Sequence, residues 1–345
     1  MILDDDPDGD WTAPGVFRCA PGVYRIPLPL PNDGLRAVNV YAVADGDGLT
    51  LVDAGWALAE ARELLAKALA ALDAGFPDVR QFLVTHVHRD HYTQAVVLRR
   101  EFGMKVALGR GEESGLKIIN SERADGTANQ ARLARAGAQE LLRTLATMPP
   151  PPPDPAHWGY PDHWIEDGEE IVVGEGETSR RLLAVATPGH TRGHVVFADE
   201  LAGLLFAGDH VLPRITPSLA LEPDPTSSPL TAFLTSLELM RTRPDAALLP
   251  AHGPVGMRVH ERVDQLIAHH AARLDASLTA VREGRSTAHE VAGALPWTRR
   301  ETRLVDLDPF NAMLATLETA SHLQVLVERG AVRVTEQDGI DYYTT

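Results

Sequence analysis

Four side chains that commonly bind metal ions lie within six residues of one another: His86, His88, Asp90 and His91. They directly follow an apolar run that ends at Thr85. Burying several imidazoles and a carboxylate together is costly unless a partner compensates them, so a hydrophobic core does not account for this cluster. Imidazole and carboxylate ligands without a thiolate suit Zn²⁺, and they also suit Fe or Mn. The cluster therefore predicts a metal centre in a loop at a strand end, with a chance group of solvated histidines as the alternative.

The pattern His-x-His-x-Asp-His after a strand resembles the signature of the metallo-β-lactamase superfamily. Four other segments resemble further motifs of that family and occur in the expected order: Leu51–Gly55, Thr187–Thr191, Phe206–Asp209 and Pro250–Gly253. The resemblance extends over residues 20 to 256 and implies an α/β fold, the αββα four-layer sandwich. Within that superfamily, the residues of these motifs are most similar to those of the glyoxalase II-like group.

The resemblance also implies a dinuclear metal centre. Its ligands would be His86, His88 and His190 for one ion, Asp90, His91 and His252 for the other, and Asp209 as the bridge. A water between two divalent cations would lose its proton near neutral pH and attack the substrate. Asp90 could double as a proton acceptor, and Asp53 could orient a ligand histidine. The expected cofactors are two divalent ions, with zinc ahead of iron or manganese.

Other histidines are weaker candidates. His194 could donate a hydrogen bond behind the ligands, and His210 could lie near the metals without touching them. His157 and His163 could line a substrate pocket, with packing of their loop as the alternative. Many family members have a glycine pair after the signature, whereas this chain has Tyr92, which we expect to narrow the mouth of the pocket.

Alternating strand and helix patterns surround these motifs and favour an α/β fold. Strands are expected at residues 22–28, 37–44, 49–52, 82–85, 105–108, 171–173, 181–186, 195–198, 204–207 and 247–250. Helices are expected at residues 57–72, 93–101 and 230–241. We predict a leader over residues 1–19, a catalytic domain over 20–257 and a winged-helix-like domain of three helices and a hairpin over 258–345. An inserted cap, helical and then proline-rich at residues 149–153, is expected over about 111–164.

Composition narrows the function classes. With 44% hydrophobic and 23% charged residues, the chain falls in the ordinary globular class. A single cysteine, Cys19, excludes an intramolecular disulfide and a thiolate cluster. We see neither a signal peptide nor a membrane-spanning run, so we expect a cytoplasmic protein without membrane partners. The net charge of −16 makes nucleic acid a poor partner, whereas a small-molecule substrate and a homodimer both fit.

The function we expect is hydrolysis of a thioester or ester, such as an acyl-CoA-type substrate. An acidic residue at position 209 disfavours a true β-lactamase, which typically has cysteine or serine at that step. A lactonase and an endoribonuclease of the winged-helix subgroup are the enzymatic alternatives. Residues 258–345 contain ten Arg or Lys against thirteen Asp or Glu, a net of −3 that is poor for gripping phosphate. A non-enzymatic DNA-binding regulator is the alternative from another class.

Overall fold

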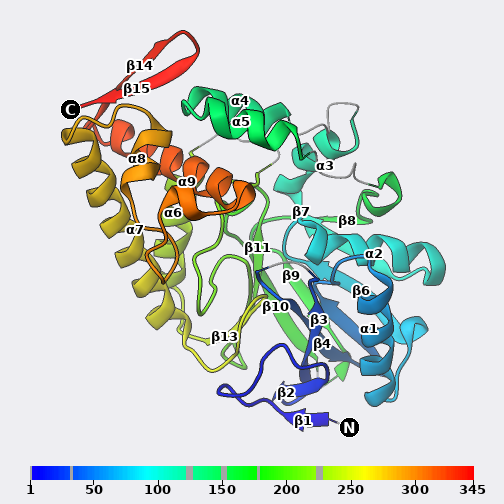
Figure 1. The fold of residues 1–345 in the computed structure, drawn as a ribbon. Coiled ribbons are helices and arrows are strands. Elements are labelled where there is room, and N and C mark those ends of the chain that lie inside the picture. Colours follow the sequence, from blue (N-terminus) through cyan, green and yellow to red (C-terminus); the bar gives the residue numbers. More distant parts are fainter. Residues whose placement is uncertain (1, 32–33, 122–126, 149–153, 177–178, 223–227) are drawn as a thin grey trace.

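Two β-sheets lie against each other at the centre of the protein (Figure 1). The computed structural model describes residues 2–31, 34–121, 127–148, 154–176, 179–222 and 228–345. Within these ranges the first sheet has eight strands in chain order: β1 (Ile2–Asp4), β2 (Val16–Ala20), β3 (Val23–Pro29), β4 (Ala37–Asp45), β5 (Gly48–Val52), β6 (Val79–Val84), β7 (Lys105–Gly109) and β8 (His163–Ile165). The second has five, in the order β13 (Ala247–Pro250), β12 (Leu204–Gly208), β11 (Val195–Asp199), β10 (Arg180–Ala186) and β9 (Glu170–Val173).

Helices cover the outer face of each sheet. The helices α1 (Ala59–Ala71) and α2 (Arg89–Phe102) share a buried apolar cluster with the first sheet. The helices α6 (Pro229–Thr242) and α7 (Val259–Arg282) share another cluster with the second sheet. The layers therefore follow the order helix, sheet, sheet, helix, which is the expected α/β arrangement.

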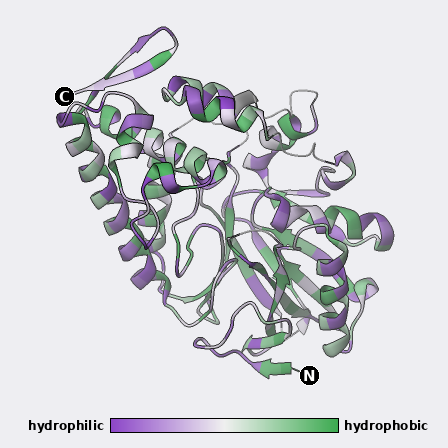
Figure 2. Cartoon of the chain, in the orientation of Figure 1, coloured by the Kyte–Doolittle hydropathy of each residue, from purple (hydrophilic) through white to green (hydrophobic). Residues whose placement is uncertain are grey.

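Strand β4 shows how the sequence specifies these layers. Val38, Val40 and Ala42 belong to the cluster shared with α1 and α2, whereas Tyr41 and Val43 belong to the cluster between the sheets. Successive side chains of a strand point to opposite faces, so a strand that is apolar on both faces is buried on both. Helices at the surface, such as α7, instead show hydrophilic and hydrophobic residues in alternation (Figure 2).

The N-terminal residues are part of the first sheet, which the expected leader over residues 1–19 did not foresee. Strand β1 pairs in parallel with β2, and Asp5 follows β1 directly. The Asp5 carboxylate lies 2.6 Å from the guanidinium of Arg25, whose side chain is only 2% exposed. Arg25 also donates to Asn39, which in turn donates to the carbonyls of residues 250 and 253. The N-terminal segment that was predicted to be a leader therefore compensates the buried positive charge of Arg25.

The inserted segment contains α3 (Glu113–Ile119), α4 (Thr127–Arg135) and α5 (Gln139–Ala146), so its first part is helical, as expected. Its end forms β8, which pairs in parallel with β7 and so belongs to the sheet. The proline-rich run at residues 149–153 lies outside the described residues. Short 3₁₀ turns are η1 (Phe76–Asp78), η2 (Arg110–Glu112), η3 (Pro155–His157) and η5 (Leu304–Asp306).

The C-terminal segment continues from α7 through α8 (Ala288–Ala294) and α9 (Pro309–Glu328) to a hairpin of β14 (Arg333–Gln337) and β15 (Ile340–Thr344). Three helices and a hairpin follow in the predicted order, and their assignment as a winged helix stays a prediction. Leu133 of α4 and Leu317 of α9 share an apolar cluster, so the insertion packs on this segment. Among the described helices, none has the length and apolar character needed to cross a membrane.

Candidate metal centre

The predicted ligands all follow strand ends at one edge of the two sheets. His86 and His88 lie in the turn after β6, and Asp90 and His91 lie in the first turn of α2, where the sequence had indicated a loop. The other three come from the turns after β10, β12 and β13, and are His190, Asp209 and His252. Ends of neighbouring strands meet at one edge of a sheet, which brings residues distant in sequence together.

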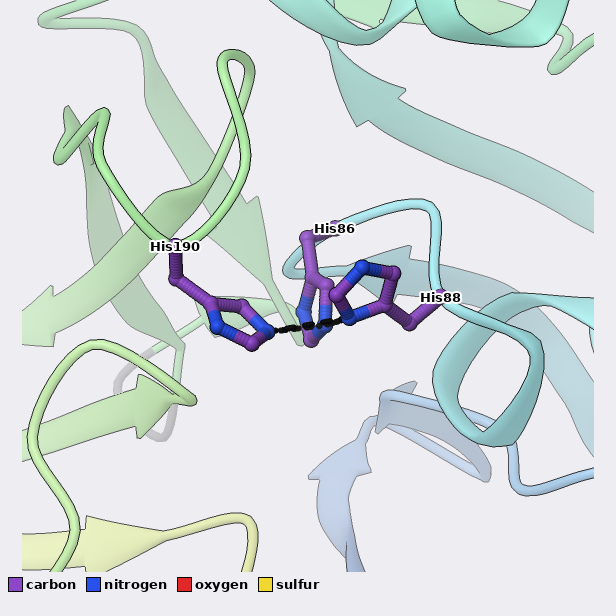
Figure 3. Close-up of side chains that lie close together, drawn as sticks. All are labelled: His86, His88 and His190. Carbon is purple, nitrogen blue, oxygen red and sulfur yellow. Dashed lines mark hydrogen bonds between the residues drawn. The ribbon is translucent and has the colours of Figure 1, made fainter. Parts of the chain in front are cut away.

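Site one consists of His86, His88 and His190, whose rings converge (Figure 3). The His86 Nε2 atom lies 3.0 Å from His88 Nδ1 and 3.2 Å from His190 Nε2, and the last two atoms are 3.0 Å apart. Three ligand nitrogens at about 2.0–2.1 Å from one tetrahedral zinc ion lie about 3.3 Å from one another. The three imidazoles are therefore spaced as ligands of a single small cation.

Site two consists of Asp90, His91 and His252. The Asp90 Oδ2 atom lies 3.6 Å from His91 Nε2 and 3.4 Å from His252 Nε2. Asp209 lies between the two sites, because its Oδ1 atom is 3.3 Å from His252 Nε2 while its Oδ2 atom is 3.3 Å from His190 Nε2. Each oxygen of Asp209 thus faces a different site, which is the arrangement a bridging ligand requires.

Unpartnered polar atoms test whether this pocket fits a cation. His91 Nε2, His252 Nε2 and Asp209 Oδ1 are buried and have no hydrogen-bond partner among the described residues. Buried polar atoms are nearly always satisfied, and the exceptions call for a missing ion or water. All three atoms point at site two, and the ligand set combines imidazole with carboxylate, which suits Zn²⁺, Fe or Mn. The residues therefore fit a pair of divalent cations.

The second nitrogen of each candidate ligand imidazole has a partner, and for three of the imidazoles this is a carboxylate or carbonyl oxygen within 2.9 Å. His91 Nδ1 donates to Asp53 Oδ2 over 2.9 Å, and His252 Nδ1 donates to the Ala37 carbonyl over 2.7 Å. His190 Nδ1 donates to the Ser218 carbonyl over 2.6 Å. Such bonds fix the tautomer and ring orientation, so that the other nitrogen presents its lone pair to the site.

The two sites differ in charge. Burial and the neighbouring imidazoles lower the pKa of His86 well below its ordinary value, and burial together with His190 lowers the pKa of His88 to about 3. These histidines are neutral. At site two burial also acts against the charged form, but Asp53, Asp90 and Asp209 outweigh it and raise the pKa of His91 to about 9. A cation entering site two would displace that proton.

His194 lies behind Asp209 and belongs to none of the candidate ligand groups. Its Nε2 atom accepts the backbone N–H of Asp209 over 3.1 Å, and its Nδ1 atom lies 2.8 Å from the Thr187 hydroxyl. Gly208 has a φ of 50°, and a Cβ there would lie 2.6 Å from His194 Nε2. Only glycine allows the strand end to approach this imidazole so closely. His194 therefore positions Asp209 through the backbone.

The remaining candidates are not members of the ligand groups, although His210 directly follows Asp209. Tyr92 is buried against the first sheet and its hydroxyl donates to the Gly159 carbonyl, so the expectation that it narrows the mouth was wrong. Its position in the inward face of α2 accounts for the difference. His163 begins strand β8 and bonds Glu169 over 2.7 Å at the surface. His210 is fully buried next to the ring of Phe233.

Glu112 is a buried residue that the sequence motifs did not single out. Its carboxylate accepts the hydroxyl of Thr191, the residue after His190. Burial and the nearby Glu222 carboxylate raise the pKa of Glu112 to about 8. It lies where the η2 turn packs directly against the backbone of Gly193. Nothing in its local sequence distinguishes it from a surface glutamate.

Comparison with known proteins decides the family. The profile of the Metallo-beta-lactamase superfamily matches residues 33–252. The chain belongs to this superfamily. With its full set of candidate ligands and its hydrolase relatives, it is a metal-dependent hydrolase.

Several relatives resemble the chain over nearly its whole length. A metallo-beta-lactamase family protein of Thermus thermophilus is 30% identical, with a TM-score of 0.75 over 95% of this chain and 99% of that one. A beta-lactamase domain protein of Burkholderia ambifaria is 27% identical, with a TM-score of 0.79 over 99% and 97%. A protein of Bacillus subtilis (strain 168), named a probable metallo-hydrolase, is 25% identical over 93% of this chain and 96% of its own. The similarity therefore includes the C-terminal segment of this superfamily member.

Proposed function

We propose that this superfamily member is a dinuclear metal-dependent hydrolase that cleaves thioesters or esters, within the glyoxalase II-like group. The observation that carries the dinuclear part is the position of Asp209, whose two oxygens each lie 3.3 Å from a histidine of a different site. A single-ion site has no need of a carboxylate divided in this way. Zinc is the cation we propose first, because its usual ligands are those present.

The two cations, when bound, supply an activated water and polarise the substrate carbonyl. Asp209 holds the sites at a fixed separation, and Asp90 presents a carboxylate between His91 and His252 that can accept a proton. Asp53 keeps a proton of His91 on Nδ1, so that the Nε2 atom, which faces Asp90, is free to bind a cation. The chain itself therefore orients ligands, neutralises charge and offers a proton acceptor.

Thioester cleavage is supported by several relatives that are named as thioesterases of one substrate. The atrochrysone carboxyl ACP thioesterase of Aspergillus novofumigatus is 25% identical over 86% of this chain and 78% of its own. A carboxylate at the bridge, rather than cysteine or serine, agrees with this class and not with a true β-lactamase. The net charge of −16 also argues against polyanionic nucleic acid as the substrate.

We further propose that the winged-helix-like segment over residues 258–345 completes the catalytic domain instead of binding nucleic acid. Its net charge is −3, and α7 shares an apolar cluster with α6 and the second sheet. A domain that binds DNA needs a basic face. The packing of this segment against the helices and sheet of the catalytic domain instead favours a role in stabilising that domain.

A metal analysis followed by a substrate screen tests the proposal. Protein reconstituted with zinc, iron or manganese should hold two ions per chain and hydrolyse an acyl-CoA thioester or an ester faster than a lactone, a β-lactam or short RNA. His190→Ala should lose metal and activity, whereas the matched variant His163→Ala, at an exposed surface position, should keep both. Fewer than two ions in the reconstituted protein would overturn the dinuclear assignment, and turnover of RNA alone would overturn the substrate class.

A further inference from the structure

The loop that follows Asp209 passes directly behind site one. We call residues Leu212–Glu222 the site-one loop. Its Ser218 carbonyl accepts the Nδ1–H of His190 over 2.6 Å, and its Leu221 carbonyl faces His88 Nε2 at 3.4 Å. Two of the three imidazoles of site one therefore depend on backbone acceptors from one irregular segment. A shift of this loop would turn both rings.

Arginines from other parts of the chain hold the site-one loop on its outer side. Arg262 of α7 donates from Nε to the Leu212 carbonyl over 2.5 Å and from Nη2 to the Ile215 carbonyl over 2.9 Å. Arg299, after α8, donates to the carbonyl of Arg214, which lies between these two residues. These contacts connect the C-terminal segment to the beginning of the loop.

A second anchor comes from the inserted segment. Arg132 of α4 donates from Nη1 to the Ala220 carbonyl over 2.8 Å. Ala220 lies between Ser218 and Leu221, whose carbonyls face the ligand histidines. The loop is therefore held at both ends by guanidinium groups that originate outside the metal-binding motifs.

The contacts of Arg262 indicate a positioning role more than a surface charge pair. Its side chain is partly buried, and the side-chain oxygen that it bonds among the described residues is the amide of Gln265, not a carboxylate. Instead its planar guanidinium group donates hydrogen bonds to two backbone carbonyls that lie three residues apart in the loop. Charge-assisted bonds of this kind are about twice as strong as neutral ones, and the rigid fork adds directionality that a lysine lacks.

We propose that Arg262 is a positioning residue for the metal centre: through the site-one loop, the C-terminal segment holds His190 and His88 in the orientation that binds the site-one cation. This inference rests on the dinuclear function proposed above. It gives the C-terminal segment a definite task, namely to support one of the two sites. Site two is independent of it, because His91 and His252 are oriented by Asp53 and by the Ala37 carbonyl in the first sheet.

Stepwise metal titration of Arg262→Gln tests the proposal. Losing an outer-shell partner of a metal ligand typically weakens binding 10–100-fold, and Arg262 acts one bond further out, so we expect about a 10-fold loss. One of the two binding steps should weaken by that factor while the other stays unchanged. When Co²⁺ is titrated and visible absorption is recorded, the spectrum of only one of the two bound ions should differ between Arg262→Gln and the wild-type protein. Arg262→Lys should recover part of the lost affinity.

The matched control is Arg258→Gln, since Arg258 lies next to α7 and bonds Asp245 but not the loop. It should leave both steps unchanged. If Arg262→Gln fails to fold, Arg132→Gln tests the other anchor of the loop with the same expected result. A wild-type protein that binds fewer than two ions would refute the proposed function. A wild-type protein that binds two, with variants that bind both equally well or lose both steps alike, would refute this inference alone.

Discussion

Replacing Asp53 by asparagine should weaken the second metal site through a change of tautomer. Asp53 Oδ1 accepts the backbone N–H and the hydroxyl of Thr85 over 2.8 and 2.9 Å, and its Oδ2 accepts His91 Nδ1–H over 2.9 Å. The single oxygen of asparagine would stay with Thr85, so that its amide group would face His91. Two donors cannot face each other, and the proton of His91 would move to Nε2, the atom that faces Asp90 and Asp209.

We expect Asp53→Asn to lower the affinity of site two about 10–100-fold, which corresponds to about 1.4–2.7 kcal/mol. Site one should keep its affinity, because its link to Asp53 runs from His86 through the Thr85 hydroxyl, which the asparagine oxygen would still accept. Metal content after dialysis against graded chelator concentrations, combined with calorimetric titration, measures both steps. The kcat of thioester hydrolysis should fall in parallel with the loss of the second ion.

The control is Asp45→Asn, which alters a similarly buried aspartate at the other end of the sheet. Asp45 bonds the Thr50 hydroxyl and the Gly174 backbone N–H, and neither lies at the metal centre. Any general cost of losing a buried carboxylate should therefore appear in both variants. Two ions bound with wild-type affinity in Asp53→Asn would refute the tautomer argument.

Three further predictions concern stability and pH. His194→Phe leaves the backbone N–H of Asp209 without its acceptor, so the free energy of unfolding in urea should fall by about 1–3 kcal/mol, and an unchanged midpoint would contradict the positioning role. Asp5→Ala leaves the buried Arg25 guanidinium uncompensated and should cost about 3–5 kcal/mol, while Asp4→Ala, whose side chain is 90% exposed, should have little effect in the same denaturation. In chelator-treated protein the raised pKa of His91 stabilises the fold fully below about pH 6.5, its usual value in the unfolded chain. This contribution should disappear as the pH rises through about 9, and a denaturation midpoint without any decrease over that range would contradict the charge assigned to His91.

The sequence predicted the candidate ligands because each belongs to a short motif after an apolar strand. His86, His88, Asp90 and His91 are close in sequence, so their clustering was visible directly. The other three were visible only through the order of motifs that resemble the family. Alternation along β4 likewise indicates that Val38, Val40 and Ala42 share one face, and these three belong to one buried cluster. These features are local, and local patterns can be read from the chain.

The features that escaped prediction depend on long-range contacts. Strand β1 has only three residues and is followed by a run of acidic residues, and it is held because Asp5 bonds Arg25, twenty positions later. Glu112 looks like an ordinary surface acid until the fold buries it against Thr191. Backbone acceptors such as the Ser218 carbonyl carry no signal in residue type at all. Tertiary packing, and not propensity, decides each of these.

These outer contacts divide the metal centre between the two halves of the fold. At site two, Asp53 and Ala37 come from the first sheet, whose strands are held by extended ladders of backbone hydrogen bonds. At site one, Ser218 and Leu221 come from an irregular loop that α4 and α7 hold through arginines. A regular sheet resists displacement more than a loop held by a few side chains. Perturbing the insertion or the C-terminal segment should therefore weaken site one before site two. Sequence changes in these two segments can thus alter the ligands of the site-one ion while site two keeps its geometry.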